Sequence, residues 1–455
     1  MADLTGIDLG RVRELEVAEN ARFAAERPQS MARTERGKRS MPLGVPNSWM
    51  DELYEHPPLW VASGKGARFV DVDGHEYIDM YIADMSAFCG HAPDAVIRAV
   101  SHRMALGNHF LLPNDDAIEV AEHLATRYGQ PKWQFTHSAT QANTEVIRLA
   151  RRATGREVVL VFDGKYHGHG DATLVAIDEG TVVAEYQGLP KSISGQARVV
   201  SFNDVDELER ALAPGDVALV LTEPAMTNAG FLLPEPGFHA AVRRLTRDAG
   251  TLLAIDETHS LVCAYAGLAR KWDLESDFLI LGKSIAAGVP LGTYGMSNEI
   301  ASIFHDLPIE YDVSGAVIDE VPTGGTLFGN ALAMAAGRAA LTEVLTHQAF
   351  AHAGALGDRL GAGLWTAIAA AGLPWSVVQE GAHACYFFVP VPPRNAAESR
   401  AADDIALRAL LRVFMANRGV MESGWWLGPT VTIAHTAPDV DRYLAVFAEF
   451  LTAVT

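Results

Sequence analysis

An acid and an amine each follow a short apolar run in the second half of the chain. Leu252 to Ile255 is followed by Asp256, and Phe278 to Leu281 is followed, after one glycine, by Lys283. Short apolar runs between turn signals predict buried parallel strands, and catalytic groups of open α/β sheets gather at the carboxyl ends of such strands. We therefore expect this carboxylate and this amine to meet at one edge of one sheet.

Together, the two side chains indicate a particular chemistry. A lysine amine can condense with an aldehyde to form a Schiff base, and a buried carboxylate can keep a pyridine nitrogen protonated. These are the groups that a protein contributes to pyridoxal phosphate (PLP) chemistry. Taken singly, each residue fits an ordinary role better, with Asp256 capping the next loop and Lys283 in solvent. The pair, with the motifs below, favours a cofactor site.

Two further groups of residues follow predicted strands. Ser138-Ala139-Thr140 lies where a strand at 133–136 turns into a helix at 140–153. Free backbone N–H groups there could bind a phosphate, although Ser and Thr are also ordinary helix caps. Tyr166 and His167 follow a strand at 157–162. Tyr166 could stack on a planar cofactor, and its alternative role is to pack a loop.

An acidic residue and a glycine-rich loop complete the set of candidates. Glu223 ends a strand at 217–224 and is expected beside the cofactor, unless it is only a solvated residue before Pro224. The segment 324–330, GGTLFGN, precedes a long helical stretch. Its glycines permit close approach to a ligand or a partner chain, and Thr326 could donate to a phosphate. A flexible loop is the alternative.

Composition limits the classes of function. The chain has 455 residues, of which 49% are hydrophobic and 20% charged, as in soluble globular enzymes, and this length predicts two domains. The formal net charge of −20 argues against nucleic acid as a partner. The three cysteines lack metal-ligand spacing, the N-terminus lacks the apolar core of a signal peptide, and no apolar run approaches membrane-spanning length. We expect a cytoplasmic enzyme without a metal and without membrane contact.

The order of predicted elements indicates an α/β fold. An amphipathic helix is expected at 8–27 and a hairpin at 66–80. From about 116 to 283, helices and strands alternate, which predicts a mainly parallel sheet with helices on both faces. Past 336 the pattern becomes α+β, with strands at 375–378, 384–389 and 430–434 and a final helix. We expect an N-terminal segment 1–85 that joins the small domain, a large domain 86–335, and a C-terminal small domain 336–455.

The order and spacing of these motifs resemble the class III aminotransferases, a family of fold-type I (aspartate-aminotransferase-like) PLP enzymes in which glutamate-1-semialdehyde aminomutase is a close relative. The resemblance extends from about residue 40 to the C-terminus. It rests on the motifs DVDG, SATQA with IRLARRATGR, YHGH, EP, DE, LGK and GTLFGN, which occur in the family's order. Each motif alone is weak, and the set is specific.

This resemblance implies a role for each residue around the cofactor ring. Lys283 would form the Schiff base with PLP and carry a proton between the substrate carbon and the cofactor. Asp256 would pair with the pyridine nitrogen. Tyr166 would stack on the ring with His167 beside it, and Glu223 would lie near the substrate side.

The resemblance also implies how the phosphate is held. Ser138, Ala139 and Thr140 would bind it from within one chain, and Thr326 would bind it from the neighbouring subunit. This arrangement would make a homodimer the smallest active form.

Several positions depart from the family pattern or concern the substrate. Ala139 replaces the usual glycine, and His259 stands where Gln or Met is usual, near the cofactor's phenolic oxygen. There His259 could donate a hydrogen bond or only fill space. Met50 stands where the aminomutase has its carboxylate-binding arginine, so Trp49 and Met50 suggest a more apolar substrate end, with residues 425–426 as further possible walls. Asn228 matches an aminomutase asparagine.

The sequence favours a PLP-dependent aminotransferase with a ping-pong cycle through pyridoxamine phosphate. Its small-molecule partners would be an amino donor and a carbonyl acceptor. The first alternative keeps the cofactor and is a glutamate-1-semialdehyde-type aminomutase or an amino-acid racemase. The second alternative is a non-catalytic PLP-binding homologue, against which the intact Lys283 and Asp256 argue.

Overall fold

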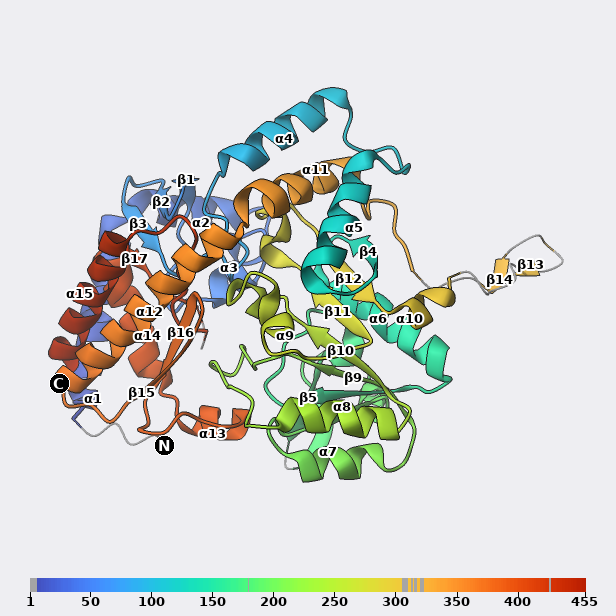
Figure 1. The fold of residues 1–455 in the computed structure, drawn as a ribbon. Helices are drawn as coiled ribbons and strands as arrows, with labels where there is room; N and C mark the ends of the chain where they lie inside the picture. Colours follow the sequence, from blue (N-terminus) through green and yellow to red (C-terminus); the bar gives the residue numbers. More distant parts are fainter. Residues whose placement is uncertain are drawn as a thin grey trace.

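A seven-stranded sheet lies at the centre of the structure (Figure 1). The computed structural model describes residues 6–178, 180–304, 310–311, 314, 317–319, 323–424 and 427–455. In spatial order, the strands of this sheet are β4 (Lys132–Thr136), β12 (Gly292–Met296), β11 (Phe278–Leu281), β10 (Leu252–Asp256), β9 (Val217–Thr222), β5 (Val158–Phe162) and β8 (Ala197–Val200). β12 runs antiparallel to both of its neighbours, and β11, β10, β9, β5 and β8 pair in parallel. The prediction of a mainly parallel sheet is confirmed.

Alternate residues of the central strands face two different cores, because successive side chains of a strand point to opposite sides. In β10, Leu253 and Ile255 belong to one core and Ala254 to the other. α7 (Val205–Leu212) and α8 (Phe238–Asp248) contribute side chains to the first core, and α6 (Ala139–Thr154) contributes to the second. The sheet is therefore covered on both faces, and only the ends of its strands are free to form a site.

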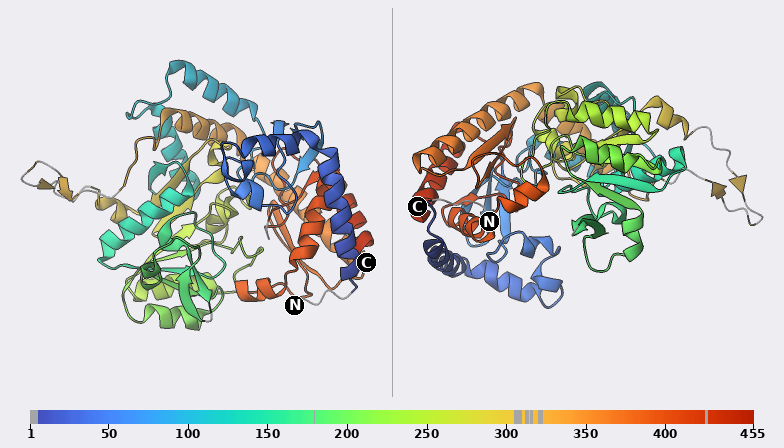
Figure 2. Two further views of the ribbon diagram at one scale, coloured as in Figure 1. Left: turned by 180° about the vertical axis from the view of Figure 1, so that it is seen from behind. Right: turned by 90° about the horizontal axis from the view of Figure 1, so that it is seen from below.

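The two ends of the chain pack together beside the sheet (Figure 2). α1 (Leu9–Glu26) contacts α14 (Ile405–Ala416) and α15 (Ala437–Val454), and β3 (Glu76–Asp79) pairs in parallel with β17 (Val420–Met421). β3 also closes the predicted hairpin with β2 (Arg68–Asp71), and β1 (Val61–Lys65) pairs with β2. The division into domains at residues 85 and 335 stays a prediction.

The remaining elements are short hairpins and connecting helices. The hairpins are β6 (Val175–Asp178) with β7 (Thr181–Ala184), β13 (Glu310–Tyr311) with β14 (Val317–Asp319), and β15 (Ser376–Glu380) with β16 (His383–Phe387). The other α-helices are α2 (Pro28–Gly37), α3 (Trp49–Glu52), α4 (Asp94–Leu106), α5 (Asp115–Tyr128), α9 (Gly267–Lys271), α10 (Asn298–Ser302), α11 (Ala331–Ala339), α12 (His347–Ala370) and α13 (Ala396–Ala401). Within the described ranges, no helix combines the length and apolar character needed to cross a membrane.

The strand predicted at 430–434 is wrong. The backbone N–H of Thr430 donates to Met80, that of Val431 to Ala382, and that of Ile433 to Phe88. These acceptors lie in three separate segments, so no single neighbouring strand forms a ladder with this stretch. The apolar alternation of TVTIA reflects burial among several segments.

Candidate active site

A cavity of about 600 Å³ lies at the carboxyl ends of the central strands. Its walls include residues at or shortly after the ends of β4, β5, β9, β10 and β11, because parallel strands bring their carboxyl ends to one edge. The residues predicted from the sequence that line it are Trp49, Ser138, Ala139, Thr140, Tyr166, His167, Glu223, Asp256, His259 and Lys283. The structure therefore brings together ten of the predicted site residues.

Asp256 is buried, and both of its carboxylate oxygens accept hydrogen bonds from the protein. Its Oδ2 accepts from His167 Nδ1 at 2.9 Å and from Asn143 Nδ2 at 2.9 Å, and its Oδ1 accepts from the backbone N–H of Thr258 at 3.0 Å. Burial alone would raise the pKa of the Asp256 carboxyl, but the hydrogen bonds, His167's foremost, bring it below its usual value. Asp256 is therefore a fixed negative charge at the cavity wall.

Lys283 begins a 3-10 turn, Lys283–Ala286, directly after β11. Its φ is +51°, a left-handed conformation that is uncommon for residues other than glycine. Its ammonium donates a hydrogen bond to Asp84, which also lines the cavity. The backbone thus aims the amine into the cavity.

The N-terminus of α6 forms a cradle suited to a phosphate. Ser138 caps this 16-residue helix, and the first N–H groups of a helix have no acceptor within it. A Cβ at Gly292 would overlap the carbonyl group of Ser138, and a Cβ at Gly168 would overlap the hydroxyl of Thr140. Only glycine at these two positions allows the cradle to be so tightly packed.

A chain of polar contacts links Glu223 to Asp84 through Thr227 and His259. Thr227 Oγ1 lies 2.6 Å from Glu223 Oε2 and 2.6 Å from His259 Nδ1, and His259 Nε2 lies 3.3 Å from Asp84 Oδ1. Burial raises the pKa of the Glu223 carboxyl. Glu223 and Asp84 therefore lie at the two ends of a contact chain that passes through His259.

Aromatic rings line one side of the cavity. The Trp49 and Tyr166 ring centroids are 5.5 Å apart, and Trp49 is 5.2 Å from His169. Trp49 and Tyr166 both belong to the cavity wall, so a planar ligand there would meet an aromatic surface.

The remaining predicted residues lie outside this cavity. Met50 is 51% exposed and lines a separate apolar hollow. Asn228 lines an adjoining hollow of about 490 Å³, and its Nδ2 lies 3.2 Å from His259 Nδ1. Thr326 is exposed in the loop before α11, and residues 425–426 fall outside the described residues. The roles of these residues stay predictions.

Asn143, Thr227 and Asp84 contact predicted site residues and were not predicted from the sequence. Asn143 lies one helical turn after Ala139, so the i, i+4 spacing of α6 could have indicated it. Thr227 follows Glu223 by four residues in an irregular segment. Asp84 lies in a stretch without periodicity, and no sequence signal marks it.

The residues of the cavity fit pyridoxal phosphate. The α6 cradle suits its phosphate, Asp256 its ring nitrogen, Tyr166 its ring face and Lys283 its aldehyde. His167 Nε2 and Thr258 Oγ1 are buried and have no hydrogen-bond partner among the described residues. Buried polar atoms without partners are rare in folded proteins, and they are expected where a polar ligand belongs.

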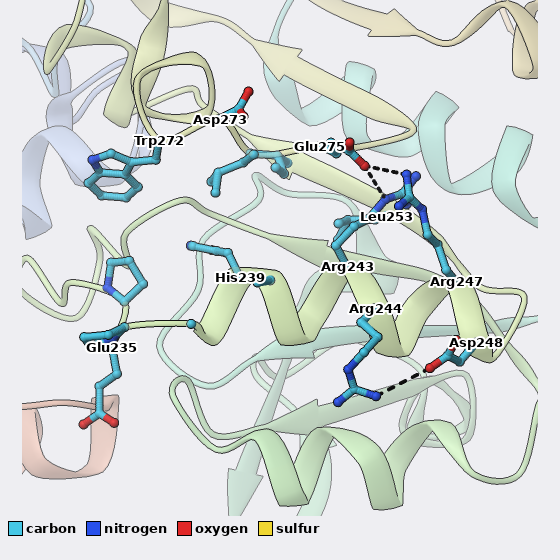
Figure 3. A pocket seen from close by; sticks show the side chains of 16 residues that line it. Glu235, His239, Arg243, Arg244, Arg247, Asp248, Leu253, Trp272, Asp273 and Glu275 are labelled. Atoms are coloured by element: carbon cyan, nitrogen blue, oxygen red, sulfur yellow. Dashed lines mark hydrogen bonds and ion pairs between the residues drawn. The ribbon is translucent and has the colours of Figure 1, made fainter.

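Another hollow, of about 650 Å³, lies between α8 and the start of β10 (Figure 3). Its arginines already pair with acids: Arg243 binds Asp277 at 2.9 Å, and Arg247 binds Glu275. The described lining of this hollow includes none of the predicted site residues. We therefore place the chemistry in the cavity around Lys283.

Comparison with known proteins supports this assignment. The family model described as aminotransferase class-III matches residues 50–382. A glutamate-1-semialdehyde 2,1-aminomutase of Gemmatimonas aurantiaca is 38% identical over 289 residues, which make up 62% of this chain and 64% of that protein. Among solved structures, a glutamate-1-semialdehyde aminomutase from Pseudomonas aeruginosa PAO1 has a TM-score of 0.94 at 39% identity and covers 99% of this chain and 100% of its own.

Two further structures bear on the cofactor and the reaction. A lysine-to-alanine variant of the Pseudomonas protein was solved in complex with PMP. An omega-transaminase from Sphaerobacter thermophilus has a TM-score of 0.84 at 29% identity and covers 93% of this chain and 97% of its own. These likenesses confirm the fold-type I architecture predicted from the motifs, and the aminomutase names favour the alternative reaction over ping-pong transamination. The chain belongs to the class III aminotransferase family.

Proposed function

We propose that this protein is a PLP-dependent aminomutase that moves an amino group between adjacent carbons of one substrate. The observation that carries the proposal is the likeness to aminomutases along nearly the whole chain, with 39% identity and a TM-score of 0.94. Glutamate-1-semialdehyde is the first substrate to test, because the relatives are named for it.

When bound, pyridoxal phosphate supplies an aldehyde carbon that joins amines and a ring that takes up the electron pair of a broken C–H bond. The N–H groups at the start of α6 would hold the phosphate. The Asp256 carboxylate would hold a proton on the ring nitrogen, and His167 and Asn143 fix the direction of that carboxylate. The Lys283 amine would take a proton from the substrate carbon that bears the amino group.

The test is an incubation of the purified, PLP-loaded protein with glutamate-1-semialdehyde alone. An aminomutase converts it to the isomer in which the amino group has moved from C2 to C1 and the carbonyl from C1 to C2, without any second carbonyl compound. Substrate labelled with ¹⁵N should give product in which the label is retained, measured by mass spectrometry. No isomer after many cofactor equivalents of substrate would contradict the proposal.

An aminotransferase is the second candidate, and one observation favours it. No arginine is among the described residues that line the cavity, and Met50 lies elsewhere. A substrate carboxylate is best held by a bidentate arginine, so an uncharged amine would suit this cavity better. In that case amino groups would move only when both a donor and a carbonyl acceptor are present, and the donor would lose its label to the acceptor.

A further inference from the structure

Four consecutive residues beside the cavity adopt a left-handed backbone conformation. Their φ angles are +49° at Ile82, +48° at Ala83, +54° at Asp84 and +65° at Met85. This conformation is costly for residues other than glycine, and most costly for a β-branched residue such as Ile82. A run of this kind persists only where the surroundings hold it, and strained backbone gathers at functional sites.

The surroundings hold this stretch at both ends. The Ile82 N–H donates to Asp79 Oδ1 at 2.7 Å, and the Ala87 N–H donates to the Ile82 carbonyl at 2.9 Å. Ile82 and Met85 are buried in the apolar core. The side chain between them, Asp84, lines the cavity instead.

Asp84 contacts two cations or potential cations there. Its Oδ2 accepts a hydrogen bond from the Lys283 ammonium, and its Oδ1 lies 3.3 Å from His259 Nε2. The side chain keeps 25% of its surface exposed, toward the cavity. Its sheltered position alone would raise the pKa of the Asp84 carboxyl, but Lys283 and His259 bring that pKa well below its usual range.

We propose that Asp84 is a positioning residue for Lys283, the counter-ion that holds the amine within reach of the substrate and stabilises the ammonium formed when Lys283 takes up the substrate proton. This inference rests on the proposed function, in which Lys283 must take up a proton and return it. Without a partner, a lysine side chain has many rotamers, and a charged one moves toward water. The Asp84 carboxylate keeps the Lys283 amine inside the cavity through their hydrogen bond. The left-handed backbone of residues 82–85 fixes the position of that carboxylate.

The contact chain connects Asp84 with Glu223, a second acid of the cavity wall. Asp84 touches His259, which touches Thr227, which touches Glu223. Tyr81 and Tyr166 also lie close enough to Asp84 for its charge to raise their pKa values, although burial is the larger cause. A change at Asp84 is therefore expected to alter the charge balance of the whole cavity.

The test uses Asp84→Asn in the full chain. Asparagine keeps the shape of the side chain and, like aspartate, tolerates a positive φ, so the backbone is preserved. Asp84→Gly is a second variant for the same conformation in case the first folds poorly. Asp94→Asn is the matched control, because it removes the same charge from an exposed ion pair with Lys65.

The first readout does not depend on turnover. Protein freed of cofactor is treated at pH 7.5 with an amine-acylating reagent, and the modification rate of Lys283 is followed by peptide mass spectrometry against exposed Lys132. The ion pair with Asp84 must break before the nitrogen attacks the reagent, and a carboxylate partner of this kind is worth about tenfold or more. Lys283 should therefore react about tenfold faster in Asp84→Asn than in wild type, with no change in Asp94→Asn. Equal rates in all three proteins would overturn the inference.

The second readout is the visible absorption of the PLP-loaded protein as a function of pH. The absorbance is plotted against pH, and the midpoint of its change is the pH at which half of the protein has changed its spectrum. Loss of Asp84 removes a negative charge beside the nitrogen of Lys283, so this midpoint should fall by about one pH unit or more. A midpoint that does not move would also overturn the inference. If wild type fails to isomerise glutamate-1-semialdehyde while both readouts change, the proposed function fails and the role of Asp84 stands. If isomerisation occurs and neither readout changes, only the role of Asp84 fails.

Discussion

Glu257 is a fully buried acid directly beside Asp256, and it provides a prediction about stability. Its side chain is 0% exposed, and it is hydrogen-bonded to the Ser260 hydroxyl and to the backbone N–H of Ala269. Burial raises the pKa of the Glu257 carboxyl from 4.5 to about 7, despite these hydrogen bonds. Glu257 therefore carries a proton over much of the range below neutral pH.

The sign of the effect follows from the two pKa values. Below pH 4.5 both the folded and the unfolded chain hold the proton, so the full contribution to stability is present. Between pH 4.5 and about 7 only the folded protein holds it, and each rise in pH favours unfolding. With about 1.36 kcal/mol per pKa unit, the free energy of unfolding falls by about 3 kcal/mol in total, and this fall is complete above about pH 7. For a chain of 455 residues this corresponds to about 3 °C in Tm.

Glu257→Gln should remove this pH-dependent fall in the free energy of unfolding, because glutamine does not ionise. A glutamine keeps an acceptor for the Ala269 N–H, and its NH₂ group replaces the oxygen that accepts from the Ser260 hydroxyl, which can turn to accept instead. Calorimetric Tm values of variant and wild type are compared from pH 5 to pH 8 on cofactor-free protein. The variant should gain about 3 °C relative to wild type across this range.

The control is Glu209→Gln, at an exposed position of α7. Its Tm difference from wild type should stay constant over the same pH range. If the Glu257→Gln difference were also constant, Glu257 would not be protonated in the folded protein at pH 5–7, and the reasoning would be refuted.

Three further predictions concern the cofactor, the reaction and the packing of the chain ends. Lys283→Ala should abolish turnover with little change in Tm, and full activity in that variant would contradict the mechanism. Gly168→Ala should weaken PLP binding about tenfold, as judged by absorption titration, because the added methyl group would displace Thr140 from the phosphate cradle. Arg27→Met should lower stability to urea by about 3 kcal/mol, since Arg27 donates to Asn417 Oδ1 at 3.0 Å and to the Ala416 carbonyl across the chain ends, and to the Phe23 carbonyl in its own segment. An unchanged urea midpoint would show that these bonds contribute nothing net.

Much of the site could be predicted because it follows from the topology of the sheet. Strand ends are visible in the sequence as apolar runs that stop at polar residues, and parallel pairing carries those ends to one edge. Asp256 and Lys283 could therefore be placed together from their positions in the sequence alone. The helix that begins near Ser138 could be placed there for the same reason.

The parts that could not be predicted depend on irregular backbone. Asp84 reaches Lys283 only because four successive residues are left-handed, and no residue type there marks that conformation. The stretch 430–434 has the alternation of a strand, yet its N–H groups bond to three separate segments. Met50 and Trp49 are neighbours in α3, and the turn of that helix sends them to different hollows. Periodicity describes regular elements, and these features depend on tertiary packing.

The four acids near the cavity suggest why the site carries the charge it does. Asp256 and Asp84 each face a cation or a hydrogen-bond donor set, and the pKa of each carboxyl is below its usual value. Glu223 and Glu257 face mainly hydroxyls and backbone, and burial raises the pKa of both. Environments that push pKa values apart assign different roles to like groups, and the two acids whose partners favour the charged form are Asp256 and Asp84. In the proposed reaction each of these two carboxylates faces a group that carries positive charge, the ring nitrogen beside Asp256 and the amine of Lys283 beside Asp84.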